Sequence, residues 1–163
     1  MMIYIDPVTY INLLRFTKVD TLSPTSEPSA KFTYWHSTRL GKSQGEISQQ
    51  QEITRQAVSK AIKSQERDIL ERMLNFAQAI GVLVEWYDVS LGILIGITPQ
   101  LENRTCLIFI DDRNQVLVFY DQEGYTSDKF PNEMAIDRIN ETLHTNLEKI
   151  LGFKEIATKL TDR

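Results

Sequence analysis

The sequence has 163 residues, of which 42% are hydrophobic and 25% are charged, and its formal net charge is −4. This length suits one full domain or two small ones, and the hydrophobic share excludes a wholly disordered chain. The negative charge excludes a generic nucleic-acid coat, which would be strongly basic. A single cysteine, Cys106, excludes an intrachain disulfide.

Two features of the sequence concern the membrane. No stretch approaches the ~20 apolar residues that are needed to cross a bilayer. The first residues also lack the basic segment and apolar run of a signal peptide. We therefore expect a cytoplasmic protein with no membrane partner.

Residues 1–30 are predicted to form a leader and a linker. Ile3 and Ile5 alternate as in a strand, and Asp6 followed by Pro7 is typical of a helix start. The prolines and hydroxyl residues of 21–29 favour extended or turn conformations.

The next section, residues 31–80, has the pattern of three helices. Phe32, Trp35 and Leu40 suggest the first, which Gly41 ends. Ser43 is expected to cap the second, and Glu46 three residues later to complete a capping box. Thr54 is expected to cap the third helix, which meets no glycine or proline before residue 81.

The third helix carries a long apolar stripe. Ile62, Ile69, Met73, Phe76 and Ile80 recur at steps of seven, four, three and four residues, which fits a heptad seam. We expect residues 64–81 to be a linker helix that pairs two copies of the chain as a homodimer. The alternative is that the stripe folds back on the chain's own sheet.

Residues 82–163 are predicted to form an α+β domain that folds on its own. Four β-rich runs, at 82–87, 91–98, 105–110 and 115–120, suggest an antiparallel meander. A closing helix is expected over 131–151, with Gly152 at its end. This domain would dimerise the protein, sense a small-molecule effector, or both. The predicted fold class is therefore α+β, with an N-terminal helical domain over 31–63, a long linker helix, and a C-terminal sheet with a closing helix.

The start of the third helix carries the candidate binding residues. Its outward positions are Arg55, Gln56, Ser59, Lys60 and Lys63, which all donate hydrogen bonds and include no acid. Gln can pair with adenine in the major groove, and Arg or Lys with guanine or phosphate. Residues 31–72 also hold eight basic and five acidic residues, a local excess in an acidic chain.

The stretch from Gly41 to Ile62 resembles a known motif. Gly41, Ser43, Glu46 and Ile47, followed by the run TRQAVSKAI from Thr54, are similar to the helix-turn-helix of sigma factors and LuxR-type regulators. The layout also loosely resembles archaeal Tfx-type regulators. The resemblance covers about 25 residues. It implies that double-stranded DNA is the partner and that Gln44 contacts phosphate. The full set of candidate DNA-binding residues is Lys42, Ser43, Gln44, Thr54, Arg55, Gln56, Ser59, Lys60 and Lys63.

Three residues depart from that motif. Ser48 stands where alanine usually packs between the helices, Gln51 where leucine is usual, and Glu52 where glycine takes a left-handed turn. A non-glycine residue in that conformation costs roughly 1 kcal/mol. The turn is therefore expected to be longer or differently shaped.

No other chemistry-bearing pattern emerges. His36 and His144 are isolated, and Asp111, Asp112 and Asn114 fit a hairpin turn better than a calcium loop. We expect no metal, no cofactor and no catalytic residue, and hence a transcription regulator rather than an enzyme. The alternative function is an interaction module that docks on RNA polymerase or another regulator; a small enzyme built on residues 82–163 is the weakest option.

Overall fold

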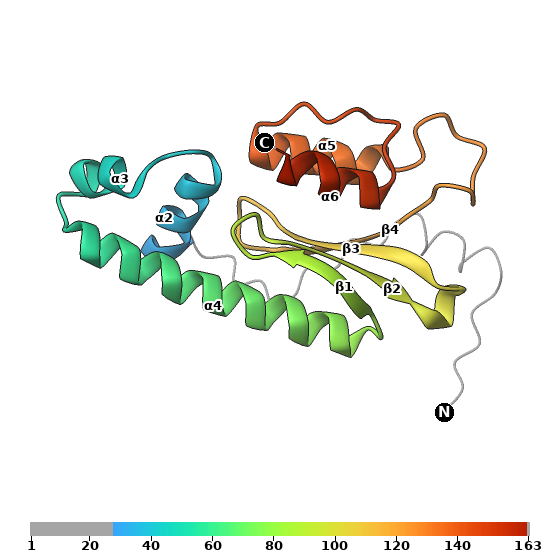
Figure 1. Cartoon of the computed structure of the whole chain (residues 1–163), viewed down its shortest axis with the longest axis horizontal. Helices are drawn as coiled ribbons and strands as arrows, with labels where there is room; N and C mark the ends of the chain where they lie inside the picture. Colours follow the sequence, from blue (N-terminus) through green and yellow to red (C-terminus); the bar gives the residue numbers. More distant parts are fainter. Residues whose placement is uncertain (1–27, 163) are drawn as a thin grey trace.

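The computed structural model of the protein describes residues 28–162. The strand, helix and most of the linker expected before residue 28 lie outside these residues. In the described part, helices precede and follow one four-stranded sheet (Figure 1). The predicted α+β class is confirmed.

Three helices open the described chain: α2 (Ala30–Arg39), α3 (Gln44–Gln51) and α4 (Arg55–Ala79). Each starts at a hydroxyl side chain that accepts a hydrogen bond from the backbone N–H three residues later. These caps are Ser29, Ser43 and Thr54. Such caps satisfy one of the N–H groups that a helix start leaves unpaired. The expected helix starts at Ser43 and Thr54 are thus confirmed.

The sheet is an antiparallel meander in the order β1-β2-β3-β4, as predicted. Its strands are β1 (Leu83–Asp88), β2 (Ile93–Thr98), β3 (Arg104–Ile110) and β4 (Val116–Tyr120), and a short 3₁₀ helix, η1 (Pro99–Leu101), follows β2. The pairing of β1 with β2 shifts register between Val84 and Trp86. Next to this bulge the Leu83 carbonyl approaches Gly96 so closely that a Cβ there would collide with it.

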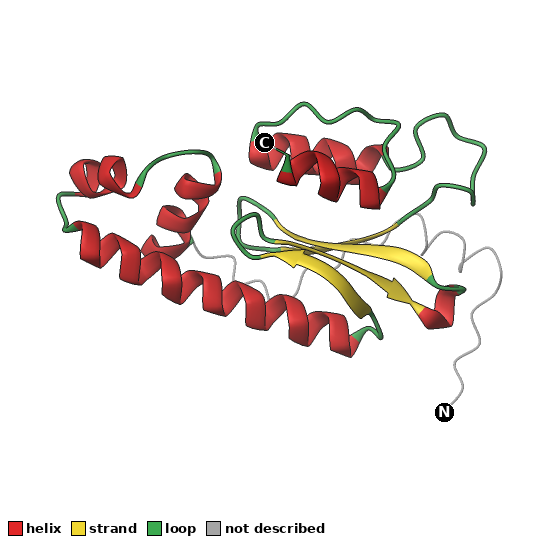
Figure 2. Cartoon of the chain, viewed as in Figure 1, coloured by secondary structure: helices red, strands yellow, loops and turns green. Residues whose placement is uncertain are grey.

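Helices cover both faces of the sheet, giving three layers (Figure 2). Strand residues alternate between the faces. Leu94, Ile108 and Val118 join the core formed with α2 and α4, whereas Ile95, Leu107 and Leu117 join the core formed with α5 and α6. The expected boundaries at residues 63 and 81 therefore do not coincide with a break in packing. Independent folding of residues 82–163 stays a prediction, and it would leave one face of the sheet uncovered.

The apolar stripe of α4 packs within its own chain. Ile69 and Met73 have no exposed surface, Ala77 is 1% exposed, and all three share a core with β2, β3 and β4. These three residues are therefore not free to pair two copies, which favours the alternative that the stripe folds back on the chain's own sheet; the homodimer itself stays a prediction. A homodimer would need another surface.

Polar contacts fix α2 against the sheet as well. The Arg39 guanidinium donates to the carbonyls of Leu91, Ile110 and Asp111 at 2.5–3.1 Å. It also lies over the Trp35 ring, 4.3 Å from the ring centroid. From its buried position Arg39 thus contacts both the turn between β1 and β2 and the turn between β3 and β4.

The C-terminal helices differ from expectation. Instead of one helix over 131–151 there are two, α5 (Glu133–Leu143) and α6 (Phe153–Thr161). The Asn140 side chain bonds both the N–H and the carbonyl of Leu147, which turns the chain away after α5. Gly152 precedes α6 rather than ending a helix, and the Asp121 carboxylate accepts from the N–H of Phe153 at 3.1 Å.

Candidate nucleic-acid interface

The two helices α3 and α4 are joined by a tight turn. Their apolar residues Ile47, Val58 and Ile62 are buried together with Phe32 and Trp35 of α2. This small core fixes the angle between α3 and α4. In Figure 1, α3 and the first part of α4 extend beyond the end of the sheet. The exposed face of α4 is therefore accessible there.

The turn keeps a left-handed residue although glycine is missing. Glu52 has φ 55° and ψ 42°, and the Ile53 N–H bonds the Ser48 carbonyl at 3.2 Å. The expectation of a longer or differently shaped turn finds no support, since only residues 52–54 separate the two helices. Glu52 therefore adopts a positive φ, although a side chain in this conformation is energetically unfavourable.

The capping box at α3 is only half formed. The Ser43 hydroxyl accepts from the Glu46 N–H at 3.1 Å, as predicted. Among the described residues, the Glu46 carboxylate returns no bond to the Ser43 N–H. Glu46 is consequently a free, exposed carboxylate on the first turn of α3.

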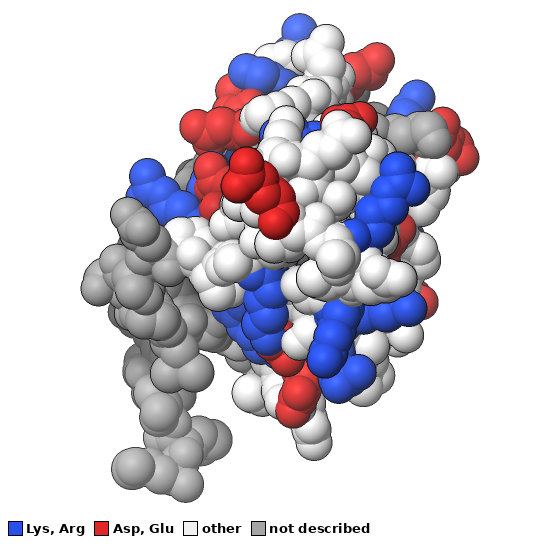
Figure 3. Space-filling model, turned by 90° about the vertical axis from the view of Figure 1, so that its left-hand side faces the viewer, with Lys and Arg blue, Asp and Glu red and all other residues white. Residues whose placement is uncertain are grey.

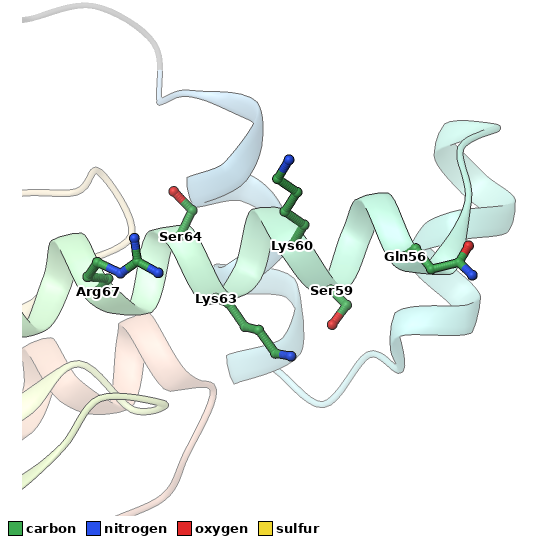
Figure 4. A pocket seen from close by; sticks show the side chains of 6 residues that line it. All are labelled: Gln56, Ser59, Lys60, Lys63, Ser64 and Arg67. Carbon is green, nitrogen blue, oxygen red and sulfur yellow. The ribbon is translucent and has the colours of Figure 1, made fainter.

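The outward face of α4 bears an open groove of about 470 Å³ (Figure 4). Four of its lining residues follow one another at steps of four, three and four, and so lie on one face of the helix. We call these four the polar stripe: Gln56, Lys60, Lys63 and Arg67. Ser59 and Ser64 complete the lining.

The cations of the stripe have no protein partners. Among residues 28–162, Lys60, Lys63 and Arg67 form neither an ion pair nor a side-chain hydrogen bond, and all three are exposed. Nearby Asp68 is instead paired with Lys31 of α2. The donors of the stripe are therefore available to an external acceptor.

This end of the molecule is mixed in charge. Figure 3 looks onto it and shows Lys and Arg side chains around a broad uncharged surface, with Asp and Glu atoms among them. A uniformly basic face would attract any polyanion, whereas this surface favours local contacts along α4.

The structure groups only part of the predicted site. Gln56, Ser59, Lys60 and Lys63 line the groove, while Arg55 is exposed at the start of α4. The remaining candidates lie outside the lining, at the start of α3 or in the turn: Lys42, Ser43, Gln44 and Thr54. Lys42 donates to Gln50 at 3.1 Å.

Sequence reasoning missed two residues of the groove, Ser64 and Arg67. Their signal was present, because Arg67 continues the spacing of Gln56, Lys60 and Lys63 by one more turn. Arg67 lies beyond the end of a short helix-turn-helix motif, which is why the motif alone does not include it.

Other titratable groups in the described chain serve the fold. Burial, and then the neighbouring Arg39 cation, lower the pKa of His36 to about 4, and His36 Nδ1 accepts from Arg39 Nε at 3.1 Å. Asp111 accepts two backbone N–H groups of its hairpin and pairs with Arg138 at 2.8 Å. Between residues 28 and 162, no group of three His, Cys, Asp or Glu side chains is placed to hold a metal ion. Over the same residues, no helix is long and apolar enough to cross a bilayer.

Comparison of the chain with family models, with curated proteins and with solved structures gave no match.

Proposed function

We propose that this protein is a transcription regulator of the cytoplasm that binds duplex DNA through the outward face of α4. The observation that carries this proposal is the polar stripe. Its members, Gln56, Lys60, Lys63 and Arg67, lie on one exposed helix face and present donors that have no partner among residues 28–162. Gln and Arg or Lys side chains on a helix are suited to base edges and phosphates in the major groove.

The dimensions of the stripe agree with this role. The eleven residue steps from Gln56 to Arg67 correspond to ~16 Å along a helix at about 1.5 Å per residue. That length covers about five base pairs at ~3.4 Å each. Gln56 would then lie deepest in the major groove of the DNA, with Lys63 and Arg67 near the flanking phosphates.

So short a contact supports binding as a homodimer, since paired helices reading successive turns double the sequence that is recognised. The interface would lie on a surface other than the covered stripe of α4. The α5 and α6 side of the sheet would then be the place for an effector or a partner protein.

The proposal is tested by charge removal on the stripe. The variant Lys60→Gln, Lys63→Gln, Arg67→Gln loses three exposed cations. A matched control, Arg113→Gln, Lys129→Gln, Lys159→Gln, loses three exposed cations elsewhere. Binding to a fluorescent random duplex is measured by anisotropy over a range of salt concentrations.

We expect the stripe variant to lose up to ~2.7 from the slope of log affinity against log salt, because each phosphate contact contributes about 0.9. The control should keep the wild-type slope. An equal loss in both variants would show that binding depends on net charge alone. Absence of wild-type binding at low salt would overturn the proposal and favour a protein-docking role for the same face.

A further inference from the structure

Arg55 lies against a glycine of the neighbouring helix. A Cβ built on Gly45 of α3 would stand 2.7 Å from Nη2, 3.1 Å from Cζ and 3.2 Å from Nε of Arg55. These three distances place the guanidinium over the space that a side chain at Gly45 would fill. Gly45 thus leaves the space in which the guanidinium of Arg55, the first residue of α4, lies.

The backbone does not require glycine at this position. Gly45 lies inside the first turn of α3 and is not among the residues with positive φ. Glycine in such a position makes a helix less stable than alanine does. The observable gain from Gly45 is therefore the room it leaves for Arg55.

The guanidinium has no other partner among the described residues. Arg55 forms no ion pair and no side-chain hydrogen bond there, although Glu46 lies in α3 and Glu52 in the turn before α4. Its donors are therefore free, in a position that a methyl group on residue 45 would exclude, because that Cβ would stand 2.7 Å from Nη2.

We propose that Gly45 is a positioning residue, which leaves room for the Arg55 guanidinium to lie beside α3, where it can meet two adjacent acceptor atoms of the DNA. Those acceptors are either N7 and O6 of guanine or two phosphate oxygens. This inference rests on the proposed function. It adds a specificity-determining pair, Gly45 and Arg55, at the end of α4 next to the polar stripe.

The test uses the full chain and a duplex selected by the wild-type protein from a random pool. Affinity is measured for Gly45→Ala, Arg55→Ala and the double variant. We expect about a tenfold loss for each single variant and no further loss for the double variant, because both changes remove one interaction. The urea midpoint of Gly45→Ala should equal or exceed that of the wild type, since alanine favours the helix. A lower midpoint accompanied by weaker binding would indicate a structural role and overturn the inference.

Two further binding measurements identify the acceptor of the Arg55 hydrogen bonds. If it is guanine, replacing guanine by 7-deazaguanine weakens wild-type binding but not that of Arg55→Ala. If it is phosphate, Arg55→Ala loses equally on selected and random duplexes. Additive losses in the double variant, or unchanged binding by Gly45→Ala, would overturn the inference and leave the proposed function standing. A wild type that binds no duplex would overturn both.

The position of Arg55 can also be measured without DNA. In nuclear magnetic resonance the Nε–Hε signal of Arg55 should shift in Gly45→Ala, because the added methyl group displaces the guanidinium. An unchanged signal would overturn the positioning role of Gly45 whatever the DNA measurements give.

Discussion

Arg39 offers the sharpest test of how the N-terminal helices are attached to the sheet. Its side chain is 6% exposed and donates to three backbone carbonyls, those of Leu91, Ile110 and Asp111. Arg39→Met keeps an unbranched chain of similar reach beside Trp35 but removes every donor. The variant therefore isolates the hydrogen bonds from most of the packing.

The expected magnitude follows from two opposing terms. Arg39→Met leaves the buried Ile110 carbonyl and the half-buried Leu91 carbonyl without this donor, at a cost of roughly 1–3 kcal/mol each, whereas the Asp111 carbonyl keeps a bond from the Asn114 N–H at 3.3 Å. The variant also avoids part of the cost of burying a cation. We expect a net loss of about 2 kcal/mol in the free energy of unfolding. Urea unfolding followed by circular dichroism measures it as a lower midpoint at unchanged slope.

A matched control removes a positive charge without removing a hydrogen bond. Arg113 is exposed in the β3–β4 hairpin, and its side chain forms no ion pair or hydrogen bond within the described residues. Arg113→Met should change stability by less than about 0.5 kcal/mol. Equal midpoints for the two variants would refute the reasoning, because they would show that the three carbonyls do not depend on Arg39.

Three more predictions follow from single residues. Glu52→Gly should stabilise the fold by ~0.5–1 kcal/mol, because glycine removes the left-handed penalty; Gln51→Gly, in helical conformation, should destabilise it, and the opposite order would contradict the argument. His36 should make the fold less stable as pH falls from about 6.5 towards 4, because burial and Arg39 lower its native pKa to about 4 and the unfolded chain takes up the proton first. In His36→Gln the free energy of unfolding should depend less on pH in this range, and an unchanged pH dependence would contradict the prediction. Burial raises the pKa of Cys106 to about 12, so a thiol reagent should label it only in urea; rapid labelling of the folded protein would show an accessible thiolate.

Local chemistry explains what could be predicted from the sequence. Ser43 and Thr54 cap helices because a hydroxyl at that position reaches a nearby N–H, whatever the rest of the chain does. The alternation of the β-rich runs likewise indicates strands directly. These signals act over a few residues, so the helix starts at Ser43 and Thr54, the four strands and the exposure of Arg55, Gln56 and Lys60 agree with expectation.

Contacts between distant residues explain what could not be predicted. Periodicity shows that α4 has an apolar stripe through Ile69 and Met73, but not which surface covers it. Arg39 is charged, and charged residues are usually exposed. Its carbonyl partners lie more than fifty residues away in the sequence. The early end of α5 has a more local cause, the Asn140 amide, which bonds Leu147 seven residues later and which periodicity alone does not indicate.

The long helix α4 connects the proposed DNA contact to the sheet without a hinge. Its polar stripe ends at Arg67, and two residues later Ile69 is already buried against the sheet. No glycine or proline interrupts the helix between these halves, and Arg39 fixes α2 to the same hairpins. The direction of the polar stripe is therefore set by the sheet. A dimer formed through any surface of the sheet layer would hold two such stripes at one fixed spacing, which is what recognition of a two-fold DNA site requires.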